Sequence, residues 1–146
     1  MAKIKVGVIG CGTIANSAHI PSYLDCPDAE IKYFCDIIPE RADAAVEKYG
    51  CGKAVYDYKE ILNNDDIDAV SVCTHNDHHA MISIDFMRAG KDVLCEKPAA
   101  RTLKEALQMQ EVAKETGKVF TIDQNRRTNK ERVNFYTKRI SRSRIY

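Results

Sequence analysis

Long hydrophobic runs are missing from this sequence of 146 residues. No apolar stretch approaches the roughly 20 residues that cross a bilayer. The first five residues lead directly into a strand-like segment and contain no hydrophobic region of a signal peptide. Internal repeats and low-complexity stretches are absent as well. From these absences we expect a cytoplasmic protein with no membrane partner.

Paired metal-binding or disulfide motifs are also missing. The six cysteines include no C-x-x-C pair, and no group of cysteines and histidines has zinc-finger spacing. Cys35, Cys73 and Cys95 lie inside or at the ends of apolar runs, where cysteine behaves as a small hydrophobic residue. We therefore expect reduced core thiols and no metal site. Cys11 is an exception, because it lies in a glycine-containing loop.

Nucleic-acid motifs are missing in spite of a basic C-terminal segment. The net charge is +1, but eight Lys/Arg and one acid follow residue 125, so the first 125 residues carry 14 basic and 20 acidic groups. A basic segment can bind nucleic acid. No aromatic stacking platform accompanies this one, so we expect no nucleic-acid partner. A nucleophile elbow and a Walker loop are absent too.

What is present is an alternation of short apolar runs and longer amphipathic segments, which is typical of βαβ units. The length suits one domain. Helices are expected over residues 13–24, 39–49, 58–63, 78–88 and 102–116. Strands are expected over residues 3–9, 31–35, 54–56, 69–73, 93–95 and 119–122. This order predicts an α/β Rossmann fold, with a doubly wound parallel sheet in the order 3-2-1-4-5-6.

The residues after the sheet do not fit this pattern. We expect a Rossmann domain over residues 1–125 and a basic connecting segment over residues 126–146, which includes a helix over about 129–139.

A glycine loop follows the first expected strand and opens the first helix. The motif is G-x-G-x-x-A, and its residues are Gly10-Cys11-Gly12-Thr13-Ile14-Ala15. In a dinucleotide-binding domain the first glycine permits the tight turn, and the second lets the backbone approach the pyrophosphate. The pyrophosphate then meets free N–H groups at the positive end of the helix dipole. The alternative is a tight turn that needs glycines without any ligand.

An acid ends the second expected strand. Asp36 lies 21 residues after Ala15, where a carboxylate accepts hydrogen bonds from the adenosine ribose. A carboxylate repels a 2′-phosphate, so NAD is expected and NADP is less favoured. Arg41 is a competing signal, because an arginine beyond this strand can pair with that phosphate. The alternative role for Asp36 is to cap the next helix.

Two polar segments follow the fourth and fifth strands, at the sheet edge where open α/β sheets bind ligands. The first is Thr74-His75-Asn76-Asp77-His78-His79, and the second is Glu96-Lys97-Pro98. A lysine in this place can hold a substrate hydroxyl or feed a proton relay. The alternatives are helix capping by the histidines and simple solvation of the lysine.

Together these motifs resemble the Gfo/Idh/MocA oxidoreductase family over residues 3 to about 128. The family pattern is G-x-G-x-x-A, an acid ending strand two, T-P-N-x-x-H and then E-K-P; His75 stands where proline is usual. The resemblance implies that Thr74, Asn76 and His79 line the nicotinamide half of NAD. It also implies catalytic contact of Lys97 with substrate, contact of Glu96 with the cofactor ribose, and contact of the segment around Asn125 with the nicotinamide.

The resemblance implies hydride transfer between NAD(P) and a hydroxyl or carbonyl of a sugar, cyclitol or related compound. Family members carry a second α+β domain with a catalytic D-x-x-x-H histidine and often an oligomer interface, and no D-x-x-x-H occurs here. This chain alone is therefore expected to turn over little substrate, and the longer form is expected to be a homo-oligomer. A truncated product, an excised domain and a naturally short protein are alternatives. So is a different function, that of a non-enzymatic NAD-binding regulatory module.

Overall fold

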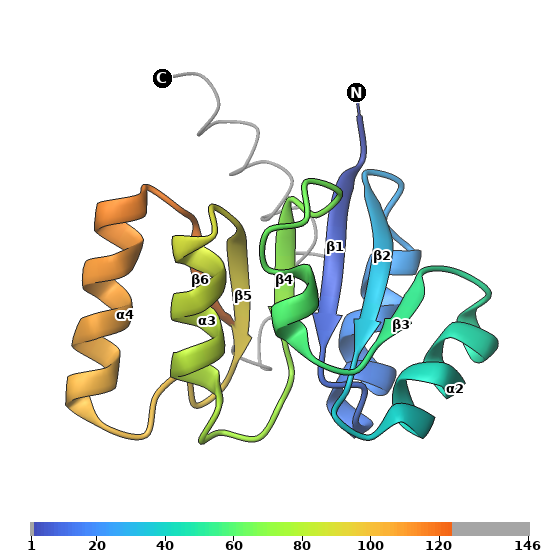
Figure 1. The fold of residues 1–146 in the computed structure, drawn as a ribbon, viewed down its shortest axis with the longest axis horizontal. Helices are drawn as coiled ribbons and strands as arrows, with labels where there is room; N and C mark the ends of the chain where they lie inside the picture. Colours follow the sequence, from blue (N-terminus) through green and yellow to red (C-terminus); the bar gives the residue numbers. More distant parts are fainter. Residues whose placement is uncertain (1, 124–146) are drawn as a thin grey trace.

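The computed structural model describes residues 2–123. Six parallel strands form one sheet in the order β3-β2-β1-β4-β5-β6 (Figure 1). Their bounds are β1 Ile4–Ile9, β2 Ala29–Cys35, β3 Lys53–Val55, β4 Ala69–Val72, β5 Asp92–Glu96 and β6 Phe120–Asp123. The predicted Rossmann topology is confirmed.

The helices begin and end where the local sequence signals place them. They are η1 Ala15–His19, α1 Ile20–Leu24, α2 Pro39–Tyr49, η2 Tyr58–Ile61, α3 His79–Arg88 and α4 Leu103–Thr116. Helix α2 starts with a proline and ends at Gly50, whose φ of 64° is left-handed. Thr102 and Glu105 form the capping box predicted for α4.

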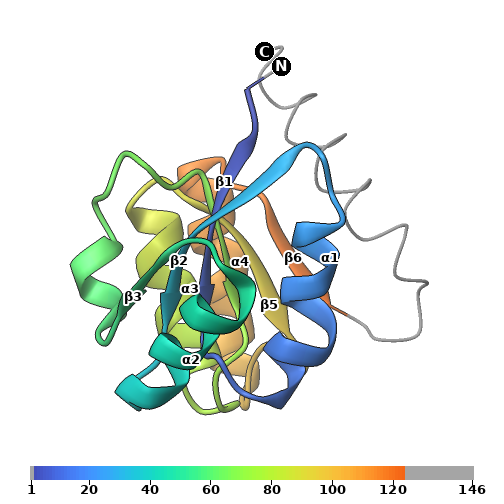
Figure 2. The same ribbon diagram turned by 90° about the vertical axis from the view of Figure 1, so that its right-hand side faces the viewer.

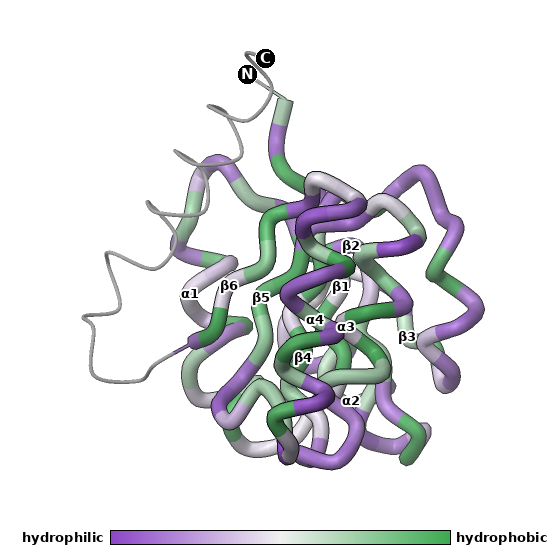
Figure 3. The backbone as a smooth tube through the Cα atoms, turned by 90° about the vertical axis from the view of Figure 1, so that its left-hand side faces the viewer, coloured by the Kyte–Doolittle hydropathy of each residue, from purple (hydrophilic) through white to green (hydrophobic). Residues whose placement is uncertain are grey.

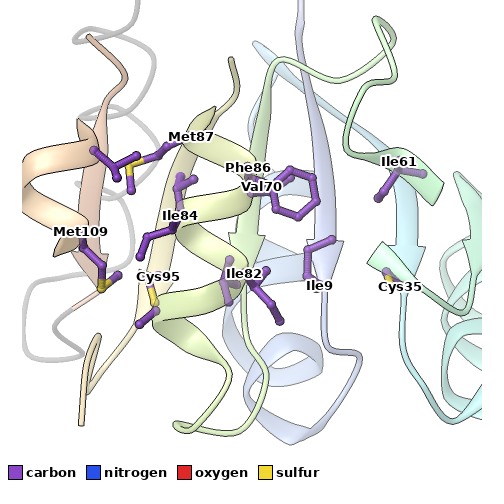
Figure 4. Close-up of a cluster of buried hydrophobic side chains, with 14 of the residues drawn as sticks. Ile9, Cys35, Ile61, Val70, Ile82, Ile84, Phe86, Met87, Cys95 and Met109 are labelled. Atoms are coloured by element: carbon purple, nitrogen blue, oxygen red, sulfur yellow. The ribbon is translucent and has the colours of Figure 1, made fainter. Parts of the chain in front are cut away.

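Helices cover both faces of the sheet. On one face, α1 and α2 pack on β1 and β2 around Val8, Ile20 and Phe34. On the other face, η2, α3 and α4 build a second cluster with Ile61, Phe86 and further residues (Figure 4). Figure 2 shows α1 and α3 on opposite sides of the sheet. The result is a three-layer α/β/α domain.

The centre of the sheet is apolar, as the run over residues 69–73 predicts. All four residues of β4 are buried, and β4 lies between β1 and β5. The strands are largely hydrophobic, and the outer turns are largely hydrophilic (Figure 3). None of the helices over residues 2–123 has the length and apolar character that a bilayer crossing requires.

All six strands run in the same direction, so their carboxyl ends meet at one edge, the lower one in Figure 1. The loops that leave this edge carry the glycine motif, Asp36, the Thr74 segment and Lys97. The fold thus gathers the predicted site residues, which come from four different strands.

Candidate nucleotide-binding site

The first glycine of the loop is required by the fold itself. Gly10 has a φ of 92°, and a Cβ there would lie 2.7 Å from the carbonyl oxygen of Cys73. Its N–H donates to the carbonyl of Cys35 at 2.7 Å. Strands β2 and β4 therefore approach the turn so closely that only glycine fits. This position needs no ligand to explain it.

The second glycine is different. Gly12 does not have a positive φ, and apart from the residues adjoining it in the chain, no atom of the described residues lies within 4 Å of a Cβ built there. Neither the backbone conformation nor the packing of the chain demands glycine at this position. Open space above a glycine at a helix start is what a closely approaching phosphate group needs. By contrast, Ala15 is fully buried against the sheet, which explains its small side chain.

The helix that follows the loop is anchored from its inner side. Its π-helical turn, η1, closes with a hydrogen bond from Ile20 N–H to the carbonyl of Ala15. The side-chain amide of Asn16 donates to the carbonyls of Cys11 and Gly12, at 2.8 and 3.0 Å. Loop carbonyls are thus satisfied inward, whereas the first N–H groups of a helix have no intrahelical acceptor. Such donors suit an anion.

Asp36 ties the loop to the start of α2. The carboxylate is buried, and its Oδ2 accepts from Cys11 N–H while Oδ1 accepts from Ile38 N–H, each at 2.9 Å. The capping alternative is not realised: Ile38 is the N-cap residue of α2, and no side chain caps the first turn of this helix. A carboxylate has about four lone-pair sites, so each oxygen can accept a further hydrogen bond from a ribose hydroxyl.

The thiol in the loop is not a nucleophile. Cys11 is buried, and its Sγ donates to the carbonyl of Cys35 at 3.6 Å. Burial, and secondarily the charge of Asp36, raise the pKa of Cys11 to about 12. A thiol with this pKa is almost entirely protonated at neutral pH and unreactive.

Two exposed isoleucines beside Asp36 were not predicted as site residues. Ile37 is 83 % exposed and Ile38 is 40 % exposed, and both precede α2. They offer an apolar surface of the kind on which a flat base packs. The available sequence signal was two large hydrophobic residues directly after the acid. Arg41 lies exposed in the first turn of α2.

The segment after β4 divides into an exposed part and a buried residue. Thr74 is half-buried, and His75 and Asn76 are exposed at the sheet edge. His79 is buried, and its ring nitrogens lie 2.8 Å from the carbonyl oxygen of Pro98 and 2.9 Å from that of Thr74. Both of its polar atoms thus have partners inside the protein. Contact of Thr74, Asn76 and His79 with a cofactor stays a prediction.

Lys97 is exposed at the end of β5, and the residue before it is not. Glu96 is buried, with its Oε1 at 2.8 Å from His19 Nε2 and its Oε2 accepting from Lys97 N–H at 3.0 Å. Burial opposes ionisation, but the hydrogen bond and charge of His19 and the Lys97 N–H outweigh it, so the pKa of Glu96 lies below its ordinary value. Contact of Glu96 with a ribose stays a prediction.

His19 was missed by the sequence analysis. It comes from η1, and its Nδ1 lies 2.7 Å from Ser71 Oγ in β4. Its Nε2 contacts Glu96 and lies 3.3 Å from Asp123 Oδ2 in β6. No motif marks contacts between residues that are 52 (Ser71), 77 (Glu96) and 104 (Asp123) positions apart. One buried ring thus connects η1 to three strands.

This network also has the residue types of a metal site, although no metal was predicted from the sequence. Ligand atoms of His19, Glu96 and Asp123 lie within 4.8 Å of one another. His19 Nε2 lies 2.8 Å from Glu96 Oε1 and 3.3 Å from Asp123 Oδ2. The three side chains thus contact one another without an ion between them.

The predicted cofactor residue Asn125, like the helix expected over 129–139, lies outside the described residues.

A hollow of about 620 Å³ lies away from the glycine loop, between α4 and β6. It is lined by residues that include Leu107, Phe120 and Ile122.

The model of the Gfo/Idh/MocA family, described as an oxidoreductase family with an NAD-binding Rossmann fold, matches residues 4–124. This chain belongs to that family. The resemblance inferred from the motifs is confirmed, and these residues form the family's NAD-binding Rossmann domain.

Its relatives include enzymes that act on sugars and cyclitols. D-glucoside 3-dehydrogenase of Escherichia coli K12 is 35 % identical over 84 % of this chain and 35 % of its own length. Inositol 2-dehydrogenase of Salmonella typhimurium is 32 % identical over 79 % of this chain and 34 % of its own length. The chain thus spans about a third of the length of the relatives it matches.

Solved structures agree in fold. The 3-ketoreductase KijD10 of Actinomadura kijaniata, in complex with NADP, superposes with a TM-score of 0.78 at 35 % identity, over 83 % of this chain and 37 % of that protein. The WlbA dehydrogenase of Chromobacterium violaceum, in complex with NADH, gives a TM-score of 0.81 at 33 % identity, over 87 % and 37 %. The family therefore includes structures with either nucleotide.

Proposed function

We propose that this chain binds NAD(H) at the carboxyl edge of its sheet. It would be the cofactor-binding part of an enzyme that transfers hydride between nicotinamide and a hydroxyl or carbonyl of a sugar or cyclitol. The observation that carries the proposal is Gly12, because the fold explains Gly10 and Ala15 but leaves the open space above Gly12 unexplained. A phosphate-sized ligand accounts for it.

Each part of a dinucleotide has a matching group along this edge. The pyrophosphate would lie at the backbone of Cys11, Gly12, Thr13 and Ile14, and the adenosine ribose at Asp36. The adenine would pack on Ile37. The nicotinamide end would reach Thr74, His75 and Asn76. These assignments rest on the order of the loops along the edge and on the exposure of their residues.

The side chains beside the ribose position favour NAD over NADP. A 2′-phosphate would lie next to the Asp36 carboxylate and beside uncharged Ile37 and Ile38. Repulsion between two anions in a half-buried place costs affinity. Arg41 is exposed at the start of α2 and is the cation that would offset this repulsion in part.

Lys97 is proposed as the catalytic residue. An exposed ammonium group at the end of β5 can donate a hydrogen bond to a substrate oxygen and take part in proton transfer. The substrate would be a polyol or sugar, and most of its binding surface would come from the rest of a longer protein. We therefore expect little turnover by residues 1–146 alone, and we expect the longer protein to be a homo-oligomer.

A cytoplasmic location is also proposed. All six cysteines are free thiols. Disulfides form in oxidising compartments and are rare in the cytosol, so six unpaired cysteines fit a reducing compartment.

Calorimetric titration with NADH and with NADPH tests the proposed cofactor. NADH is expected to bind at least about tenfold more tightly, which corresponds to about 1.4 kcal/mol. Gly12→Ala should weaken NADH binding without lowering the melting temperature. Asp36→Asn should reduce the difference in affinity between NADH and NADPH. Absence of binding by either nucleotide would overturn the proposal.

A further inference from the structure

His79 lies between the two loops that leave β4 and β5. Its ring nitrogens lie 2.8 Å from the carbonyl oxygen of Pro98 and 2.9 Å from that of Thr74. Each ring nitrogen lies within hydrogen-bond distance of a carbonyl oxygen, and a carbonyl oxygen can only accept, so the ring is the donor at these contacts. The side chain is about 1 % exposed, so water does not replace either contact.

The contact with Pro98 fixes the residue next to Lys97. On the other side of Lys97, Glu96 accepts the Lys97 N–H with Oε2 and contacts His19 with Oε1. Lys97 is therefore held at both neighbours: Glu96 is anchored by a histidine from η1, and Pro98 by a histidine from α3. The exposed ammonium group extends from a segment whose backbone has little freedom.

We propose that His79 is a positioning residue that holds Lys97 in register with the Thr74 loop. This inference rests on the proposed function, in which the nicotinamide and substrate meet between that loop and Lys97. The reasoning is geometric: a single rigid ring spans the two loops, so a shift of one carbonyl is transmitted to the other. Hydride and proton transfer both require such fixed distances.

Two isosteric variants separate the two contacts. The amide nitrogen of asparagine takes the place of His Nδ1, so His79→Asn can keep the hydrogen bond to Pro98 and lose the one to Thr74. The amide of glutamine takes the place of Nε2, so His79→Gln keeps the Thr74 bond and loses the Pro98 bond. Each variant removes one of the two contacts with a carbonyl oxygen and leaves an amide in the same buried site.

The rates of amide hydrogen exchange, measured for each variant without nucleotide, show which segment has lost its contact with residue 79. In His79→Gln, the amides of Lys97, Ala99 and Ala100 should exchange about tenfold faster than in the wild type, as expected when one hydrogen bond is lost. In His79→Asn they should stay close to wild type, and the amides of His75 and Asn76 should accelerate instead. The amides of Val70 and Val93, in β4 and β5, report global stability and should change equally in both variants.

Equal acceleration at Lys97 in both variants would overturn the proposal, because it would indicate a general loss of stability. No acceleration in His79→Gln would overturn it as well. If a variant does not fold, the ring is observed directly in the wild type by nitrogen-15 NMR. A ring N–H of His79 that exchanges slowly with solvent is expected there, and rapid exchange of the ring N–H would contradict the clamp. NADH titration of the same samples tests the cofactor proposal separately, since the exchange pattern is read without nucleotide.

Discussion

The loop after β1 and the segment after β5 lie on one edge of one sheet, but they are held by different means. The glycine loop is shaped by the close fit of Gly10 against strand ends, and the side chains of Asp36 and Asn16 hold the backbone groups of Cys11 and Gly12. The Lys97 segment is shaped by buried side chains, namely Glu96, His19 and His79.

This difference agrees with the proposed roles of the two loops. Backbone N–H groups would bind a phosphate in the first loop, which then needs a bare and closely fitted backbone. The side-chain amine of Lys97 would meet the substrate, so the second segment needs a fixed Cα from which that amine extends. Buried polar groups supply the fixation, and each needs a partner because an unpaired one is costly. Substitutions that disturb either the glycine loop or the Lys97 segment can test this comparison.

Disruption of the side-chain network should have the largest effect. His19→Leu leaves Glu96 and Asp123 buried beside an apolar group, and removal of one partner from a buried ion pair typically costs about 3–5 kcal/mol. Urea unfolding should show this loss in the free energy of unfolding. Ser17→Ala, at an exposed position in the same turn, serves as the control and should change it by less than about 0.5 kcal/mol. A loss below about 1 kcal/mol for His19→Leu would show that the network contributes little.

The two glycines of the loop should differ in stability cost. Gly10→Ala forces a left-handed conformation on alanine and places its Cβ 2.7 Å from a carbonyl oxygen, so we expect a loss of about 2–3 kcal/mol. Gly12→Ala adds a methyl group to open space and should stay within about 0.5 kcal/mol of the wild type. Thermal or urea unfolding of both variants decides this. Similar losses in the two would mean that Gly12 also has a structural role.

Low pH should reduce the stability that the buried Glu96 carboxylate, next to Lys97, contributes to the folded chain. The pKa of this carboxyl is lower in the folded chain than its ordinary value of 4.5, so Glu96 contributes stability above that pH. The contribution is lost as the pH falls through the lower, folded-state pKa. Glu96→Gln should therefore be less stable than the wild type at pH 7, and the gap should shrink below pH 4.5. A gap that does not change with pH would contradict the assignment.

The smallest effect is expected in the rates at which the cysteines are alkylated. Cys11 lies in the glycine loop and Cys95 lies in β5 close to Lys97, so their rates compare the same two regions. Burial raises the pKa of Cys11 and of Cys95 to about 12, so the thiols of both halves should resist alkylation in the folded chain. Cys26 and Cys51 are half-buried and should react first. Mass spectrometry after brief treatment with iodoacetamide measures the order of reaction. Early labelling of Cys11 would mean that the glycine loop opens in solution.

Local sequence signals predicted most of the fold. Proline at 39, glycine at 50 and the Thr102–Glu105 capping box place helix ends correctly, because capping depends on residues within one turn. The alternation of apolar runs also yielded the strand order. Strand starts were less accurate: β2 begins at Ala29 rather than at residue 31, because pairing with Ile4 extends it.

The site residues also divide into those that the local sequence predicts and those that depend on packing. By itself, the sequence determined the family, the glycine loop, Asp36 and the position of Lys97 at a strand end, because these depend on neighbours along the chain. Only the tertiary structure separated Gly10 from Gly12, and only it turned Glu96 and His79 inward to their buried partners. The physical reason is that burial and hydrogen-bond partners come from packing between distant segments, as in the contact of His19 with Glu96 across 77 positions.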